Sequence, residues 1–578
     1  MHARLAFAIR SSPWSSCWLV RFLGFFAFFA ACIHAAEPAG PPTYDFILRH
    51  GRIVDGTGNP AYHADLAVKD GRIAAIGPSA GSGRALAPAL VAGPGTREFD
   101  ATGLVIAPGF IDVHTHAEDI EEQPRAENFV RMGVTTLVLG NCGGSELNLG
   151  AFFQRLETLT ISVNVASLLG HGTVRRRAMH GAFDRVPTPE ELSHMKALVR
   201  QGMEDGAVGL STGLIYLPGT FAKTEELIEV ARVAAEYDGI YATHQRSEAG
   251  DIFKSLDEIF RIAREAHIRA EISHLKLSGP ANWGKTEQVL AAIEQARAEG
   301  LDITQDQYVY TASSTGLSQL VPEAMLEGGS ARFHERLKDP ATKAKFVEEM
   351  KETLRKRGSA DYAYAVIASY RPDPSLNGLN VVEAAKKTRG AETLDDQIET
   401  ILEIEKHGGA TAVFHGMSEP DLEAFMRHPN TMFASDSGVR RLGVDVPHPR
   451  GYGNNARVLG VYVREKKVLR LEDAIRKMTS LPATTFRFAE RGELHPGYWA
   501  DLTVFDPETV ADHATYADPH HYATGMRYVF VNGVLVVDND QPTGARPGHV
   551  LRHEIPPRPT PPSWWRGALH RASEKVSK

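Results

Sequence analysis

Cysteine is scarce in this 578-residue chain, which contains only Cys17, Cys32 and Cys142. Cys17 and Cys32 fall within or beside an apolar leader, so Cys142 is the only thiol in the body of the chain. No internal disulfide framework is therefore possible. A solitary cysteine is either a small buried apolar residue or a thiolate with a chemical role, and composition leaves both open.

An excess of positive charge is also missing. Lys and Arg total 63 against 71 for Asp and Glu, which gives a formal net charge of -8. This balance argues against nucleic acid as a main partner. The apolar run near the N-terminus, Phe22 to Ile33, is too short to span a bilayer.

That run instead predicts an export signal over residues 1–36. Three arginines precede it and the small residues Ala35 and Ala36 follow it, the order typical of a cleaved leader. We expect a periplasmic or extracellular protein. The segment ending in Cys32 also resembles an imperfect bacterial lipobox, which would anchor the mature chain through a lipid on that cysteine.

Short strand-like runs separated by turns occupy both ends of the body, over residues 44–105 and 491–545. Asp70-Gly71 and Asn532-Gly533 supply the positive φ values that tight hairpins need. Each half is too small to bury a core alone. We therefore predict that the two halves pack together as a small composite β-sandwich.

Residues 106–490 alternate strand-like and helix-like segments, the pattern of parallel βα units. This predicts an α/β fold with a (β/α)8 barrel. Residues 311–410 lack the pattern and predict an inserted, largely helical subdomain or lid. The run Thr411 to His415 is one strand too many, so either it or the Asp302 to Tyr308 run lies outside the barrel or at the rim of the insertion. Residues 546–578 are rich in proline and predict an extended tail.

Two histidines, His114 and His116, end the first apolar strand of the barrel region. Alternate residues of a strand share a face, so both imidazoles can reach one point. Other residues that bind metals follow later strands. All such strand ends open onto one face of a parallel barrel. These residues are Cys142, His244, His274 and Asp436.

This set of donors predicts zinc, because zinc accepts imidazole, thiolate and carboxylate ligands. Six ligands exceed the needs of one tetrahedral ion. Two metals bridged by the thiolate and a water would use them all. His171 also ends a candidate strand but is not assigned to metal, and the role of His415 is ambiguous.

Several motifs resemble the N-acyl-D-amino-acid deacylase (D-aminoacylase) family of the amidohydrolase superfamily. The resemblance runs from about Tyr44 to Asp538 and includes the segment ending in His114-Thr115-His116. The other motifs are Gly209-Leu210-Ser211-Thr212-Gly213-Leu214, Ile272-Ser273-His274-Leu275-Lys276, Ser435-Asp436 and His448-Pro449-Arg450.

The resemblance implies a distorted (β/α)8 TIM barrel with tight zinc binding by Cys142, His244 and His274. It implies a weaker second metal position near His114, His116 and Asp436, with Cys142 in place of the bridging carboxylated lysine of many relatives. It also implies that five residues surround the substrate. These are Tyr216, Lys276, Tyr308, Ser314 and Arg450.

We expect a linear N-acyl amino acid as the substrate and Asp436 as the general base, with Arg450 binding the free α-carboxylate through two hydrogen bonds. The segment Gly451 to Arg457 departs from the usual family pattern, which leaves the preferred side chain open. A cyclic amidase of the hydantoinase or dihydroorotase kind and a D-aminoacyl peptide hydrolase are the enzymatic alternatives. A metal-bearing binding protein on the same scaffold is the non-enzymatic one.

Overall fold

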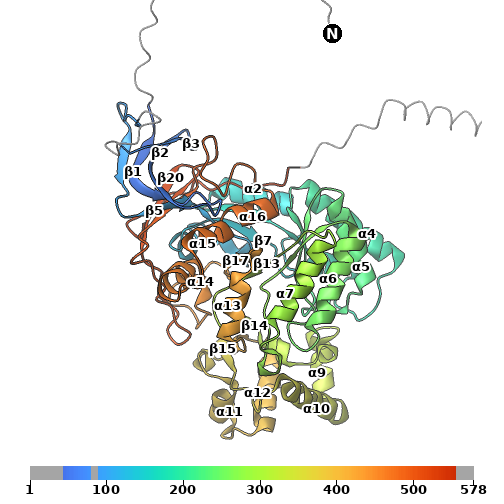
Figure 1. Cartoon of the computed structure of the whole chain (residues 1–578). Helices are drawn as coiled ribbons and strands as arrows, with labels where there is room; N and C mark the ends of the chain where they lie inside the picture. Colours follow the sequence, from blue (N-terminus) through green and yellow to red (C-terminus); the bar gives the residue numbers. More distant parts are fainter. Residues whose placement is uncertain (1–42, 80–88, 555–578) are drawn as a thin grey trace, which may run out of the picture. The chain divides into compact units, whose positions relative to one another are not determined.

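A computed structural model describes residues 43–79 and 89–554 of the chain (Figure 1). The predicted leader, with Cys17 and Cys32, and the tail beyond residue 554 lie outside the described residues. The described part is a parallel barrel, an outer β-sheet made from both ends of the chain, and an insertion.

The barrel consists of parallel strands that close on themselves. Counting β8 and β9 as one strand interrupted at Leu168, eight strands surround the axis. Backbone hydrogen bonds from Asp436 N to His114 O (2.9 Å) and from His116 N to Ser437 O (2.9 Å) join the last strand to the first. The strands are β6 (Phe110–Asp112), β7 (Val134–Leu139), β8 (Asn164–Ser167), β9 (Leu169–Gly170), β10 (Gly209–Gly213), β11 (Ile240–His244), β12 (Arg269–Ile272), β13 (Ile303–Gln307) and β17 (Thr431–Phe433).

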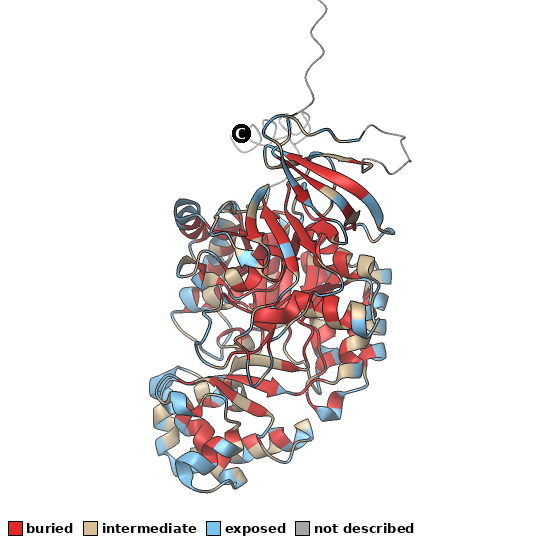
Figure 2. Ribbon diagram, turned by 90° about the vertical axis from the view of Figure 1, so that its left-hand side faces the viewer, coloured by how far each residue is buried: buried red, intermediate tan, exposed pale blue. Residues whose placement is uncertain are grey.

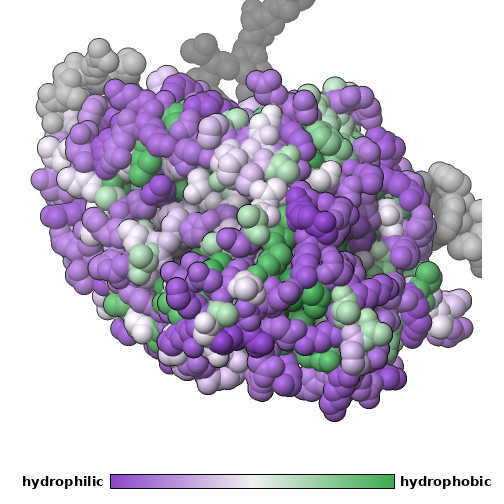
Figure 3. Space-filling model, turned by 90° about the horizontal axis from the view of Figure 1, so that it is seen from below, coloured by the Kyte–Doolittle hydropathy of each residue, from purple (hydrophilic) through white to green (hydrophobic). Residues whose placement is uncertain are grey.

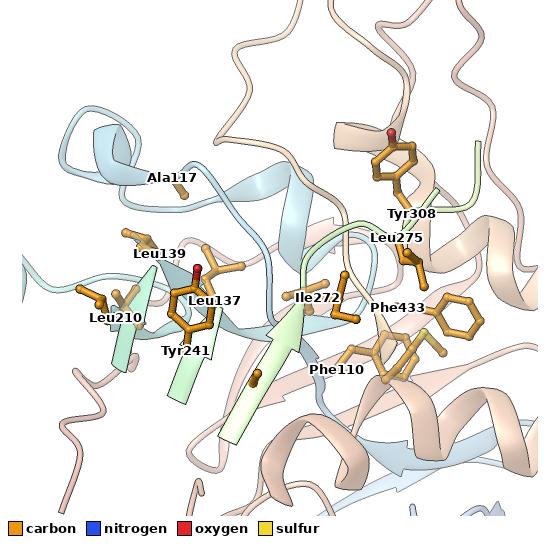
Figure 4. Close-up of a cluster of buried hydrophobic side chains, with 14 of the residues drawn as sticks. Phe110, Ala117, Leu137, Leu139, Leu210, Tyr241, Ile272, Leu275, Tyr308 and Phe433 are labelled. Carbon is orange, nitrogen blue, oxygen red and sulfur yellow. The ribbon is translucent and has the colours of Figure 1, made fainter. Parts of the chain in front are cut away.

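Alternation along each strand separates the barrel interior from the layer beneath the helices. In β11, Ile240 and Ala242 belong to the interior cluster, whereas Tyr241 belongs to the larger outer one. Figure 4 shows members of the outer cluster, including Leu210 and Phe433 from other strands. The period-two pattern therefore places every second side chain of a strand toward the barrel axis.

Helices cover the outside of the barrel. The sequence marks their ends locally: Thr188 and Glu191 form a capping box at the start of α4, where Pro189 occupies the first turn. The main helices are α2 (Leu149–Leu159), α3 (His171–Met179), α4 (Pro189–Glu204), α5 (Thr224–Ala235), α6 (Ile252–Ala266), α7 (Thr286–Ala298), α13 (Glu419–Arg427), α14 (Arg450–Arg457), α15 (Leu471–Met478) and α16 (Ser480–Phe486).

The amino-terminal end of the barrel is filled by apolar side chains. Leu481 and Phe486 of α16 pack into the same cluster as Ile111 and Met432 of the strands. The first residues of the predicted tail run beneath β8, where Leu551 N donates to Val165 O at 2.7 Å. We call this apolar end, formed by α16 and the inner strand residues, the barrel floor.

The outer sheet has nine strands from both ends of the chain. β5 (Val105–Pro108) pairs antiparallel with β18 (Leu502–Phe505), so the two halves share one hydrogen-bonded ladder. The sheet curls upon itself, as the stacked rings of Phe46 in β1 (Phe46–Ile53) and Phe530 in β19 (Met526–Val531) show, with centroids 4.5 Å apart. The composite origin agrees with the sequence expectation, and the two halves form one hydrogen-bonded sheet that folds over an apolar core of its own. Its other strands are β1 (Phe46–Ile53), β2 (Tyr62–Lys69), β3 (Arg72–Gly77), β4 (Arg97–Asp100), β19 (Met526–Val531), β20 (Val534–Asp538) and β21 (Gln541–Pro542).

The insertion lies between β13 and β17 and has its own apolar core. An antiparallel sheet of β14 (Ala312–Gly316), β16 (Thr411–His415) and β15 (Ala365–Ser369) carries α8 (Glu323–Leu326), α9 (Ser330–Lys338), α10 (Pro340–Arg357), α11 (Val381–Arg389) and α12 (Leu394–Lys406). Figure 2 shows a buried centre under helices with exposed outer faces. The surplus strand Thr411–His415 therefore belongs to the insertion, and the run ending near Tyr308 belongs to the barrel.

The face seen in Figure 3 is largely hydrophilic, with apolar residues scattered near its middle. Within the described ranges, no helix has both the length and the apolar character required to cross a membrane.

Candidate metal centre and substrate cavity

The carboxyl-terminal end of the barrel carries the reactive residues in strained backbone conformations. Cys142, His274 and Asp436 have φ values of 52°, 37° and 50°, a left-handed region that costs free energy in residues other than glycine. Gly213 permits the close approach of the Cys142 loop, because a Cβ there would lie 2.1 Å from the Cys142 carbonyl oxygen. Such strain persists where the surrounding structure imposes it, and it clusters at functional sites.

Cys142 lies among three imidazoles. Its Sγ is 3.3 Å from His114 Nε2, 3.7 Å from His244 Nδ1 and 3.6 Å from His274 Nε2. Sulfur and nitrogen ligands of one tetrahedral zinc, at about 2.3 and 2.0 Å from the ion, lie about 3.5 Å apart. The spacing of the free side chains thus matches the spacing that a shared ion requires.

Asp436 completes a second set of ligands. Its Oδ1 is 3.2 Å from His116 Nε2 and 3.7 Å from His114 Nε2, while its Oδ2 is 2.7 Å from the Arg450 guanidinium. An ion can be held by His114, His116 and Asp436 or by His114, Cys142 and His274. Both sets use His114 Nε2, so this imidazole can serve only one of them at a time. The structure therefore brings together all six residues that the sequence suggested as ligands.

The pKa values of the clustered side chains are shifted in the directions expected for a site that binds a cation. Burial alone would raise the pKa of the Cys142 thiol, but His114, His116 and His244 hold that pKa well below its usual range. Burial would likewise raise the pKa of Asp436, yet Arg450 and His116 keep it well below normal. Burial lowers the pKa of His116, but the hydrogen bonds that its ring donates to Asp436 and Cys142 outweigh this effect and raise the pKa to about 10. The anions of the cluster thus favour protonation of His114, His116 and His274, whose pKa values are raised, but not of His244, whose pKa burial lowers. A zinc ion would supply the same positive charge in place of those protons.

Two carboxylates that sequence reasoning missed orient the histidines. Asp306 on β13 contacts His114 Nδ1 at 3.3 Å and accepts a hydrogen bond from the His274 backbone N–H at 3.0 Å. Glu248 Oε1 lies 2.9 Å from His274 Nδ1 and 3.9 Å from His244 Nε2. Such partners fix the orientation of metal-binding imidazoles. Signals existed in the sequence, since Glu248 follows His244 by four residues and Asp306 lies near the end of a predicted strand.

The cavity above the metal centre has two lobes, which share Tyr216, Ser314, Thr315 and Asp436 in their walls. The first, here the arginine lobe, has a volume of about 460 Å³ and is lined by His116, Cys142, Arg176, Arg440, His448 and Arg450. The second, the aromatic lobe, has a volume of about 380 Å³ and is lined by His244, Glu248, Lys276, Arg357, Tyr364 and Phe414.

The five expected substrate residues occupy different places around these lobes. Tyr216 and Ser314 stand between the lobes, Arg450 lies in the arginine lobe, and Lys276 lies in the aromatic lobe. Tyr308 lines neither lobe: its ring is buried 4.5 Å beneath the Arg450 guanidinium. In the described structure its hydroxyl has no hydrogen-bond partner. Tyr308 therefore supports Arg450 from below.

His171 and His415, the two strand-end histidines that the sequence did not assign to metal, lie away from the candidate ligands. His171 Nε2 is 2.9 Å from Glu226 Oε1, which also pairs with Arg175. The ring of His415 packs against Tyr516 with centroids 4.7 Å apart. Structural partners thus account for both side chains.

A model of the amidohydrolase family matches residues 97–537 of this chain. The chain is 35% identical to the D-aminoacylase of Alcaligenes xylosoxydans xylosoxydans over 532 residues, covering 88% of this chain and 97% of that protein. It is 33% identical to the N-acyl-D-glutamate deacylase of the same organism over 535 residues, again covering 88% and 97%.

A solved structure shows the same likeness. The N-acyl-D-glutamate deacylase of Bordetella bronchiseptica, in complex with zinc and a phosphonate inhibitor that mimics the tetrahedral intermediate, superposes with a TM-score of 0.73. It is 35% identical to this chain, and the match covers 88% of this chain and 100% of that one. On sequence and fold together, the chain belongs to the amidohydrolase family, in its branch of D-aminoacylases.

Proposed function

We propose that this protein is a zinc-dependent enzyme that hydrolyses the amide bond of N-acyl-D-amino acids. One observation carries the proposal: the half-buried Cys142 sulfur, four imidazoles and the Asp436 carboxylate meet at one point, with Arg450 2.7 Å from that carboxylate. The names of the similar proteins support the choice of substrate class and of the D configuration.

Asp436 is the proton carrier in this proposal. When zinc is bound, it lowers the pKa of a water molecule and polarises the scissile carbonyl group. Because Arg450 and His116 keep the pKa of Asp436 low, this carboxylate is ionised at neutral pH and can accept the water proton. The same carboxyl group then passes the proton to the nitrogen of the leaving amine.

Arg450 holds the free α-carboxylate of the substrate. Its NH2 group donates to the Ser314 carbonyl oxygen at 3.2 Å, which fixes the plane of the guanidinium. In the described structure its buried Nε has no hydrogen-bond partner. A substrate carboxylate would satisfy this donor, and guanidinium groups bind carboxylates through paired, planar hydrogen bonds.

Paired enantiomers test the proposal most directly. The mature chain, loaded with zinc, is assayed for release of free amine from N-acetyl-D-leucine and N-acetyl-L-leucine, with a hydantoin as the cyclic comparison. We expect hydrolysis of the D compound, little of the L compound and no ring opening. Ring opening without deacylation would favour the cyclic amidase, and a zinc-loaded protein inert on every amide would favour the binding protein.

We also propose that the protein is exported. The support is the composition of residues 1–36, with arginines before an apolar run and small residues after it. Determining the N-terminal residue of the protein after expression in a bacterial host, and whether Cys32 carries a lipid, distinguishes cleavage after an alanine from a lipid anchor.

A further inference from the structure

The two lobes of the cavity differ in charge. Among the residues that the structure describes, three guanidinium groups line the arginine lobe, from Arg176, Arg440 and Arg450, and Asp436 is the only carboxylate that does so. Asp436 already contacts Arg450 at 2.7 Å. Two cations of this lobe are therefore left without an anionic partner in its wall.

The hydrogen-bond acceptors of these two arginines are neutral. Arg440 Nε donates to Ser437 Oγ at 3.0 Å, and Arg176 NH2 donates to the Leu217 carbonyl oxygen at 2.8 Å. Among the described residues, neither has a carboxylate within 4.0 Å. Asp119 attracts Arg440 only from beyond that distance.

The aromatic lobe offers no such surplus. Lys276 contacts Glu248 at 2.5 Å. The Arg357 guanidinium stacks 3.9 Å above the Tyr364 ring and donates to the His415 carbonyl oxygen at 3.3 Å. An aromatic face and a carbonyl group thus stabilise the one cation that lacks a carboxylate here. Of the two lobes, only the arginine lobe therefore has guanidinium groups with neither a carboxylate nor an aromatic ring as partner among the described residues.

Without a bound anion, the Arg440 guanidinium lies in an unfavourable electrostatic environment. Burial and the nearby positive charge of Arg450 lower the pKa of its guanidinium. An anion in this lobe would relieve that repulsion, and a partly enclosed cationic cavity attracts anions strongly. The α-carboxylate alone satisfies Arg450 and leaves Arg440 and Arg176 unpaired.

This inference rests on the proposed function and narrows its substrate. We propose that the arginine lobe binds a second carboxylate through Arg440 and Arg176, so that the preferred substrates are dianionic N-acyl amino acids. The second carboxylate can belong to an acidic side chain or to the acyl group. If the side chain carries the second carboxylate, the acyl group extends into the aromatic lobe; if the acyl group carries it, the side chain does. The walls of that lobe include Tyr364 and Phe414.

Two pairs of compounds of nearly equal shape separate the two sources. N-acetyl-D-glutamate against N-acetyl-D-glutamine changes the charge of the side chain. N-succinyl-D-leucine against its succinamoyl analogue changes the charge of the acyl group. We expect the dianion of at least one pair to be favoured in kcat/KM by about fivefold or more, the effect of a charge-assisted hydrogen bond.

Three test variants and one control variant show which residues produce the preference for the dianion. Arg176→Gln and Arg440→Gln should each reduce the preference by at least half without changing the hydrolysis of N-acetyl-D-leucine comparably. Arg177→Gln is the matched control, because Arg177 is the next exposed residue of α3 and does not line the lobe. Arg440→Lys keeps the charge, so it should retain part of the preference and serves if Arg440→Gln does not fold.

The outcomes separate the inference from the function on which it rests. A preference below about fivefold in both pairs, or one that survives the changes at Arg176 and Arg440, overturns the dianion inference while N-acetyl-D-leucine is still hydrolysed. If none of the five compounds is hydrolysed, both the proposed function and the inference are overturned.

Discussion

The two ends of the barrel are built from the same strands yet have opposite characters. At the carboxyl-terminal end, β11 ends in His244 and the backbones of Cys142 and Asp436 adopt left-handed φ values. At the floor, Ile111 and Phe486 pack in an apolar cluster and are 1% and 2% exposed. One end carries strain and buried charge, and the other supplies the packing that stabilises them.

This contrast shows how a fold can tolerate an unfavourable site. Buried charges and left-handed residues each cost free energy, so the site persists only because the rest of the barrel determines its geometry. Changes at the two ends should therefore have different consequences. At the reactive end, substitutions should reduce the catalytic rate without unfolding the protein. At the floor, they should lower the free energy of unfolding without reducing the catalytic rate of the folded protein.

Asp436→Asn should have the largest effect. The amide keeps the shape of the carboxyl group but cannot accept a proton, so we expect kcat to fall by about a thousandfold or more. The unfolding temperature should change little, and the zinc near Cys142 should remain. Measurements of kcat, of zinc per chain and of thermal unfolding test this; turnover close to that of the parent protein would exclude Asp436 as the base.

Phe486→Ala should have the opposite pattern. Removing a buried ring from the floor should lower the free energy of unfolding by about 3–5 kcal/mol, through lost transfer free energy and a residual cavity. The kcat of the folded, zinc-loaded fraction should stay near normal. Phe253→Ala is the control, because Phe253 is 38% exposed on α6. Denaturant unfolding and kcat measured on the same samples show whether the floor acts only through stability.

Glu248→Gln should act on the metal. If zinc binds His274 through Nε2, the Nδ1–H of that ring donates to Glu248, which also accepts from Lys276. An amide accepts these bonds more weakly, so zinc affinity should fall by about 10- to 100-fold. Competition with a chelator measures this directly, apart from turnover. Unchanged zinc affinity would mean that Glu248 does not position His274.

The sequence predicted the reactive end better than the positions of its supporting residues. His114, His116 and Cys142 follow apolar strands, and strand ends of a parallel barrel meet, so their convergence follows from topology. Asp306 and Glu248 gave weaker signals, because a carboxylate in a strand or loop looks the same whether it contacts a histidine or solvent. Only the three-dimensional contacts distinguish the two.

For the fold, too, local sequence patterns predicted some features, whereas others depended on three-dimensional contacts. Alternating βα segments predicted the barrel, and the ends of the chain predicted a shared β-structure. The sequence did not determine two features that depend on pairing between distant strands. Thr411–His415 joins the insertion because it pairs with β14 and β15, and the terminal strands form one sheet because β5 pairs with β18. Local patterns contain no information on which strand edges meet.

Thr315→Val should have the smallest effect and tests how far the insertion contributes to the reactive end. Thr315 lies on β14 of the insertion, and its hydroxyl donates to the Tyr216 hydroxyl at 3.0 Å, between the two lobes. Valine keeps the shape and removes this bond, so kcat/KM should fall by about two- to tenfold, the cost of one hydrogen bond. Ser318→Ala, a change in the same segment away from both lobes, is the control. If kcat/KM did not change, Tyr216 would be positioned by the barrel alone, and the insertion would shape the cavity without orienting its residues.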